Sequence, residues 1–280
     1  RSIGPPNAGW LVRGKQLEPR GLHHRVLQGT VKRQWNYGTD TLVTLLKHAA
    51  KVVHDAHGGP PLRVGNLSRQ RGGKIAPSVS HQSGRDADIG LYSTDLDGKP
   101  VDAPGFPKFN GARGPLLDTT GAYLFDVVRN WTFVEALLRS NIARLQWVFL
   151  DTPLKDALLD HAIRIGTTSE IIDRAEKVIV RPKNSSPHAN HFHIRIFCTD
   201  ADSADPIALK YACRDYGPEW DWVKRDREIG ELLIRDQLDR IMKGEMDLDL
   251  NPLSIGTSQK TAPSSPEQLQ DPPTSIPVGL

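Results

Sequence analysis

Two short stretches of this 280-residue chain carry side chains that commonly bind metal ions. In the first, residues 80–88, His81 stands seven residues before the carboxylate of Asp88, with Gly84 between them. The second, residues 188–195, lies about a hundred residues further along the chain. Imidazole nitrogen and carboxylate oxygen are both suitable ligands for Zn²⁺. Together the two stretches predict a zinc site that is assembled from distant parts of the sequence.

The second stretch has the alternation of a β-strand, in which every other side chain points to the same face. His191, His193 and Arg195 would share one face. The intervening apolar residues would face the core: Phe192, Ile194 and Ile196. A His-x-His pair alone could be the solvated face of any strand, but the His/Asp stretch favours a metal. Because catalytic zinc sites have three protein ligands and one open position, we expect His81, Asp88 and His193 to bind the ion.

Three further residues could take part in chemistry at this site. The sequence has no His-Glu-x-x-His motif, so the glutamate base of many zinc peptidases is absent. His191 lies two residues from His193, about 6.6 Å along a strand, and its ring could accept a proton from the attacking water. His188 would either orient His191 or bind the substrate carbonyl. Asp86, one pleat from Asp88, is either a support for the ligands or a solvated carboxylate, and we favour the support.

The two stretches resemble motifs of a known group of zinc peptidases. A His-x-x-Gly-x-x-x-Asp pattern with a distant His-x-His is typical of the group that contains lysostaphin, D-Ala-D-Ala carboxypeptidases and hedgehog domains. Within this group, residues 80–88 and 188–198 are similar to the motifs of the penicillin-insensitive murein endopeptidases. Those motifs are Ser-His-Gln-x-Gly-x-Asp-x-Asp, and His-x-x-His-x-His-x-Arg with a following cysteine. Residues 2–4 and the glycine pair at 72–73 also resemble that family, and the likeness covers about residues 1–225.

The resemblance implies a function, a cofactor and a location. It implies a murein endopeptidase with Zn²⁺ as cofactor that hydrolyses peptide cross-links of peptidoglycan and its muropeptides, at the D-alanyl to diaminopimelyl bond. Such a protein would be periplasmic or secreted by a bacterium, with its signal segment absent from this chain. Two alternatives remain: a D,D- or L,D-carboxypeptidase of the same fold, and a hedgehog-like zinc module without turnover, against which His191 argues. The chain departs from the family at Ser78, where the family has a further histidine.

Composition and charge set broad limits. With 38% hydrophobic residues, the chain can bury one substantial core, or two smaller ones, without a metal or a disulfide. It has no apolar run of about 18 residues, so we expect no membrane span. The net charge is +3, and residues 228–280 hold nine acidic and four basic side chains, which leaves +8 for residues 1–227. This basic body suits an anionic cell-wall polymer, and the lack of interleaved basic and aromatic residues argues against nucleic acid. Nothing in the sequence indicates an oligomeric state.

Cys198 and Cys213 are the two cysteines of the sequence. Their number fits either two buried thiols or one disulfide bridge. The resemblance to an exported family favours the bridge. Closing a loop of about 15 residues would contribute roughly 3 kcal/mol in the chain-entropy model.

The expected fold is α+β, with a small, mostly antiparallel sheet that carries the zinc site and is flanked by helices and long loops. Apolar residues at helical spacing indicate helices at residues 40–57, 122–140, 153–165, 169–177 and 228–243. Alternation indicates strands at residues 62–67, 88–92, 144–150, 178–180 and 192–197. Residues 93–120 lack a period and would form a long loop at the rim of the site.

Individual residues within these elements carry their own expectations. Asp40 is the expected N-cap of the first helix. We expect Trp131 in the core and His161 on a helix surface. Three other histidines would lie on the surface or cap a helix: His48, His54 and His57.

We predict a zinc peptidase domain over residues 1–227, in which residues 1–38 form a wrapping segment of irregular or short-stranded structure. Residues 228–250 would form a C-terminal helix. Residues 251–280 are rich in Pro, Ser, Thr and Gln and would be a disordered tail.

Overall fold

The computed structural model describes residues 1–110, 116–183, 185–203 and 212–243. The chain divides into two compact units, Arg1–Lys224 and Arg225–Leu280. Helix α7 (Asp221–Met242) begins in the first unit and continues into the second, and it starts seven residues before the predicted residue 228. Residues 244–250 of the predicted helix and the predicted tail lie outside the described residues. Within the described ranges, no helix combines the length and apolar content that crossing a bilayer would require.

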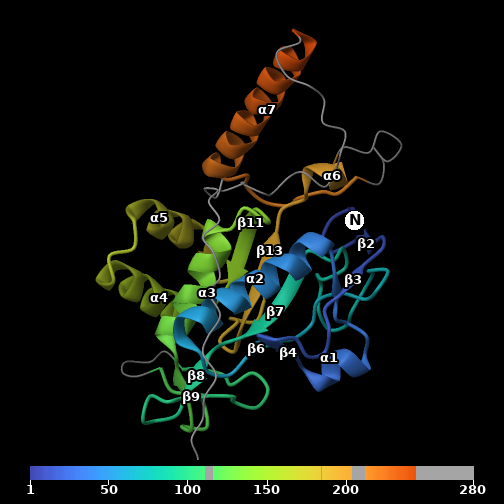
Figure 1. Cartoon of the computed structure of the whole chain (residues 1–280). Coiled ribbons are helices and arrows are strands. Elements are labelled where there is room, and N and C mark those ends of the chain that lie inside the picture. Colours follow the sequence, from blue (N-terminus) through green and yellow to red (C-terminus); the bar gives the residue numbers. More distant parts are fainter. Residues whose placement is uncertain (111–115, 184, 204–211, 244–280) are drawn as a thin grey trace, which may run out of the picture. The chain divides into compact units, whose positions relative to one another are not determined.

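A six-stranded sheet organises the first unit (Figure 1). Its three inner pairings, β11–β13, β13–β7 and β7–β6, are antiparallel, whereas the outer pairings β12–β11 and β6–β4 are parallel. This mixture of helices with a small, mostly antiparallel sheet confirms the predicted α+β class. In spatial order the strands are β12 (Ile179–Val180), β11 (Leu145–Phe149), β13 (His191–Ile196), β7 (Asp86–Gly90), β6 (Leu62–Val64) and β4 (His24–Val26).

One face of this sheet is apolar and packs into the core. Along β13 the predicted inward residues Phe192, Ile194 and Ile196 are all fully buried. Helix α3 (Val127–Arg139) covers this face, because its Phe133 ring lies 5.8 Å from the Phe192 ring. The helices α4 (Thr152–Arg164) and α5 (Ser169–Val178) complete the helical part of this unit. The polar side chains of β7 and β13 lie on the opposite face.

Helix α2 (Asp40–His57) is amphipathic and adds to the same core. Its N-cap is Thr39, whose hydroxyl accepts a hydrogen bond from Leu42 N at 3.2 Å. The prediction of Asp40 as N-cap was therefore wrong by one residue, because adjacent Thr and Asp can both cap and Asp40 lies in the first turn. The helix ends at Gly58 with φ of +61°, a conformation that favours glycine. Its buried residues include Leu42, Leu45, Leu46, Ala49 and Val53.

Helix α3 begins later than the predicted residue 122. Strand β10 (Leu124–Phe125) pairs with β8 (Ser93–Thr94), which pairs in turn with β9 (Pro100–Val101). The side chain of Asp126 then accepts a hydrogen bond from Arg129 N at 3.1 Å and so starts the helix at Val127. Leu124 has helical spacing in the sequence, yet it lies before this cap.

Two single-residue predictions have opposite outcomes. Trp131 of α3 is 1% exposed, which confirms its core position. His161 is 7% exposed, so the predicted surface position is wrong. It lies seven residues after Leu154 and three after Leu158, on the buried side of α4, where an imidazole can pack as a partly apolar ring. His48, His54 and His57 are exposed, as predicted.

The N-terminal part of the chain forms short elements, in line with the short strands expected for residues 1–38. Each strand has two or three residues, and they pair partly with one another and partly with the body of the first unit. Helix α6 (Asp200–Ser203) is also short. The elements of the N-terminal part are β1 (Ser2–Ile3), β2 (Trp10–Leu11), β3 (Lys15–Gln16), β4, α1 (Gln28–Lys32) and β5 (Tyr37–Gly38).

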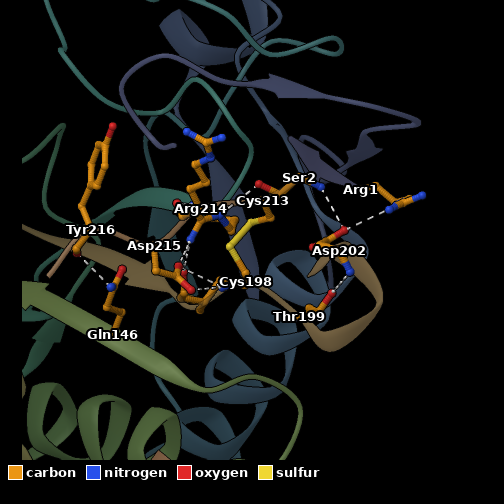
Figure 2. Close-up of a disulfide and its surroundings, with 12 residues drawn as sticks. Arg1, Ser2, Gln146, Cys198, Thr199, Asp202, Cys213, Arg214, Asp215 and Tyr216 are labelled. Carbon is orange, nitrogen blue, oxygen red and sulfur yellow. Dashed lines mark hydrogen bonds and ion pairs between the residues drawn. A yellow bond between two sulfur atoms is a disulfide. The ribbon is translucent and has the colours of Figure 1, made fainter. Parts of the chain in front are cut away.

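A disulfide joins Cys198 to Cys213, which confirms the bridge that the family resemblance favours. The carboxylate of Asp215 accepts a hydrogen bond from Cys198 N at 3.0 Å, close to the bridge (Figure 2). The same carboxylate pairs with Arg85, whose guanidinium is fully buried. Nε of Arg85 also donates to Ser2 Oγ at 3.0 Å. The bridge, the N-terminus and the segment before β7 are thus joined by one buried cation.

We expect the double substitution Cys198→Ser with Cys213→Ser to lower the free energy of unfolding by about 3 kcal/mol. The reason is that the bridge spans 15 residues and restricts the unfolded chain. Denaturant titration followed by circular dichroism measures the change. Wild-type protein in reductant is the matched control and should unfold together with the double variant. Equal midpoints for the oxidised wild type and the double variant would contradict this expectation.

Candidate metal centre

The pairing of β7 with β13 brings the two sequence motifs together. The strands are antiparallel, with His193 opposite Asp88 and Arg195 opposite Asp86. Paired residues in neighbouring strands point to the same face of a sheet. Two pairs of polar side chains, one on β7 and one on β13 about a hundred residues later, therefore gather on the face opposite the core.

His81 reaches this group from the loop before β7. Its Nδ1–H donates to the carbonyl of Leu67 at 2.7 Å, and a carbonyl can only accept, so Nε2 carries the free lone pair. This Nε2 lies 3.2 Å from Asp88 Oδ1, and the side chain is 1% exposed. The backbone of His81 has φ of +67°, an uncommon conformation for a residue with a side chain.

His193 is oriented from the other side. Its Nε2–H donates to Asp86 Oδ1 at 2.7 Å, which leaves Nδ1 free and 3.4 Å from Asp88 Oδ1. His81, Asp88 and His193 each offer one ligand atom, and these atoms lie within 4.8 Å of one another. Two imidazole nitrogens and a carboxylate oxygen, with both rings fixed by other partners, fit a divalent metal such as zinc.

Asp86 supports this group without offering a ligand atom to it. Its Oδ1 accepts hydrogen bonds from both His193 Nε2 and Arg195 Nε, each at 2.7 Å. Burial alone would raise the pKa of Asp86, but the Arg195 guanidinium and the His193 hydrogen bond hold it far below its usual range. The carboxylate is thus ionised, and it fixes the ring of His193 in the tautomer that a metal ligand requires.

Asn66 was not anticipated from the sequence. Its carbonyl accepts from Asp88 N at 2.9 Å, and its side-chain Nδ2 donates to Asp88 Oδ2 at 3.4 Å. Oδ2 of Asp88 is therefore bonded to Asn66, while Oδ1 faces His81 and His193. A polar residue within the predicted strand at residues 62–67 was the available signal.

His191 lies beside the three candidate ligands. Its Nε2 is 3.4 Å from Asp88 Oδ1, and its Nδ1–H donates to Asn190 Oδ1 at 2.7 Å. The ring stacks on Phe106, with centroids 5.5 Å apart and an angle of 23° between the planes. An imidazole held in this way keeps a lone pair at Nε2 next to the candidate metal position.

Phe106 is a second residue that the sequence did not reveal. It comes from the long loop between β9 and β10 and lies over Gly65 and Gly90. A Cβ atom added to either glycine would lie 2.8 Å from the Phe106 ring, so these two positions leave the space that the ring occupies. This contact supports the prediction that residues 93–120 contribute to the rim of the site, for the described part of that loop.

His188 completes the histidine cluster. Its ring centroid lies 4.9 Å from that of His191 and 5.6 Å from that of His193. Nδ1–H donates to the carbonyl of Ser186 at 2.6 Å. Burial, and after it the neighbouring rings of His191 and His193, lower the pKa of His188 to about 4, so the ring is neutral at physiological pH.

Ser78 makes a hydrogen bond within its own loop. Its hydroxyl accepts a hydrogen bond from Ser80 N at 3.4 Å, within the loop that leads to His81. The structure thus brings together His81, Asp88 and His193, with Asp86, His188 and His191 around them. At Ser78, where the chain departs from the family pattern, the hydrogen bond of the side chain stays within the loop that leads to His81.

Comparison with known proteins agrees with this geometry. A family model described as penicillin-insensitive murein endopeptidase matches residues 2–206. No curated protein matches the chain. The matched region contains every residue of the site described above, from Asn66 to Arg195. The chain belongs to the penicillin-insensitive murein endopeptidase family.

Proposed function

We propose that this chain is a zinc-dependent endopeptidase that hydrolyses the D-alanyl to diaminopimelyl cross-links of peptidoglycan. The murein endopeptidase family supports the substrate class. The observation that carries the metal dependence is the convergence of ligand atoms from His81, Asp88 and His193 within 4.8 Å. When bound there, zinc would lower the pKa of a bound water molecule to about 7 and polarise the scissile carbonyl.

His191 is the proposed proton acceptor. Its Nδ1–H is engaged by Asn190, so Nε2 is the atom that can take a proton from the attacking water. The Asp88 carboxylate, 3.4 Å from Nε2, would stabilise the imidazolium that forms. Stacking on Phe106 restricts rotation of the ring, so this nitrogen stays directed to the reaction centre.

His188 is proposed to orient His191. In the neutral ring, Nδ1 holds the proton that is donated to Ser186, so Nε2 can only accept. A ring in this tautomer cannot donate to a substrate carbonyl, which favours the orienting role over the carbonyl-binding role. The disulfide and the family also support a periplasmic or secreted location, which forms part of this proposal.

The proposed reaction is tested with purified cross-linked muropeptides. We expect dimers to be converted to monomers, activity to disappear with a chelator, and zinc to restore it. Chromatography of the products with mass spectrometry identifies the bond that breaks. Release of free D-alanine without loss of dimers would indicate a carboxypeptidase instead. Binding of zinc without any product would indicate a module that does not catalyse hydrolysis.

Single alanine substitutions at His81, Asp88 or His193 should each sharply reduce bound zinc, because three protein groups hold the ion. Metal content after gel filtration, measured by elemental analysis, checks the result. His48→Ala is the matched control, since His48 is exposed on α2, and it should retain zinc. Near-stoichiometric zinc in any of the three variants would remove that residue from the ligand set.

His191→Ala separates the proton acceptor from the ligands. We expect this variant to keep its zinc and its melting temperature, while turnover of muropeptide dimers falls by about 10²- to 10⁴-fold, the usual contribution of a positioned base. Metal analysis and hydrolysis rates are measured on the same preparation. Loss of zinc would make His191 a ligand, and a near-normal rate with retained zinc would reject its catalytic role.

A further inference from the structure

The N-terminal segment packs against the loop that delivers His81. Gln82 N donates to the carbonyl of Pro6 at 2.9 Å, and Gln82 Nε2 donates to the carbonyl of Asn7 at 2.8 Å. A cavity of about 640 Å³ lies between the two segments. We name this cavity the N-terminal groove, and one of its lining residues, Gln82, directly follows His81 in the chain.

Large apolar side chains are exposed at the N-terminal groove. In strand β2, Leu11 is 2% exposed and anchors the segment, while the preceding Trp10 is 57% exposed. Val79, on the opposite loop, is 77% exposed. Both exposed residues line the groove. Folding alone does not require an exposed indole beside an exposed valine, and such patches at a concave surface commonly bind a ligand.

The two chain segments that form the walls of the groove carry charged side chains of one sign. Residues 1–17 and 68–85, which contain both walls, hold seven Arg or Lys residues and no Asp or Glu. Three of the seven are paired with acidic residues outside these two segments: Arg85 with Asp215, Arg1 with Asp202 and Lys15 with Asp40. Lys74 lines the groove and is exposed, and it has no ion pair with any described residue. A groove of this charge attracts an anionic ligand.

We infer that the N-terminal groove binds the glycan strand of peptidoglycan, an inference that rests on the proposed function. The flat indole of Trp10 offers an apolar surface on which the C–H face of a sugar ring can pack, while hydroxyl groups at the ring edge stay solvated. Asn7 and Gln82 supply amide groups at the same walls. Lys74 supplies a cation for the carboxylates of the stem peptides that the strand carries.

Two variants and two controls test this subsite. Trp10→Ala removes the stacking surface, and Lys74→Glu reverses the unpaired charge. Ile163→Ala, at a 62% exposed position on α4, and Lys99→Glu, in the exposed turn between β8 and β9, are the matched controls. Co-sedimentation with insoluble peptidoglycan sacculi in the cold measures binding. We expect each groove variant to raise Kd about 10-fold, the scale of losing one anchoring contact, and the controls to match wild type.

Hydrolysis of two substrates separates glycan binding from the chemical step. On sacculi, the groove variants should raise KM about 10-fold with kcat nearly unchanged, as expected when binding energy alone is lost. On cross-linked peptides from which an amidase has removed the sugars, Trp10→Ala should equal wild type, because its indole is assigned to the sugar rings. Lys74→Glu should keep part of its loss, because the stem-peptide carboxylates that Lys74 is assigned to remain. Thermal melting confirms that each variant is folded, and Trp10→Tyr should retain part of the binding if Trp10→Ala does not fold.

Several results would overturn this inference. Wild-type binding by both variants, or equal losses for Trp10→Ala on sacculi and on sugar-free peptides, would show that the groove does not bind the glycan. Weaker binding to sacculi by Lys74→Glu but not by Trp10→Ala would mean that the groove attracts anions in general. Heparin or nucleic acid would then bind to it as well. If wild type hydrolyses neither substrate, the proposed function fails, while the sedimentation result still decides the groove.

Discussion

The site depends on two carboxylates that lie on one face of the sheet, Asp86 fully buried and Asp88 with 13% of its side chain exposed. Asp86 and Asp88 lie two residues apart on β7 and point to the same side. Burying an ionised carboxylate is costly unless cations or hydrogen-bond donors compensate it. Arg195 and His193 compensate Asp86, while Asp88 faces the imidazole rings of His81, His191 and His193. The positions of the other polar side chains of the site follow from the need to compensate these two carboxylates.

The surrounding structure also fixes an uncommon backbone. His81 has φ of +67° and His188 has φ of +58°, conformations that persist only where neighbouring contacts determine them. For His81 those contacts are the Leu67 carbonyl at its ring and the adjoining Gln82, which is bound to the N-terminal segment. Arg85 follows, tied to Ser2 and to the segment after the disulfide. The N-terminal segment therefore contributes to the shape of the site even though it offers no ligand.

Sequence patterns predicted the parts of the site that follow from local geometry. Alternation along residues 191–196 assigned the polar and apolar faces of β13, and the motif spacing selected Asp88 as the partner of His81 and His193. Phe106 and Asn66 were missed because a loop without a period gives no direction to its side chains, and because strand register depends on contacts between distant residues. The start of α3 was placed too early for a related reason: the apolar spacing continues through Leu124, but the cap at Asp126 decides where the helix begins.

The same register explains why two histidines on one strand can have different tasks. His193 lies opposite Asp88, so its ring is held between that carboxylate and Asp86. His191 lies opposite Gly90, which has no side chain, and Phe106 occupies the space that remains. The ring of His191 can therefore lie beside Asp88. Its proton is on Nδ1, so Nε2 has a lone pair and no hydrogen on the side of the candidate metal position. Alternation gives both histidines the same face, and the residue across the strand pair distinguishes the candidate ligand from the candidate base.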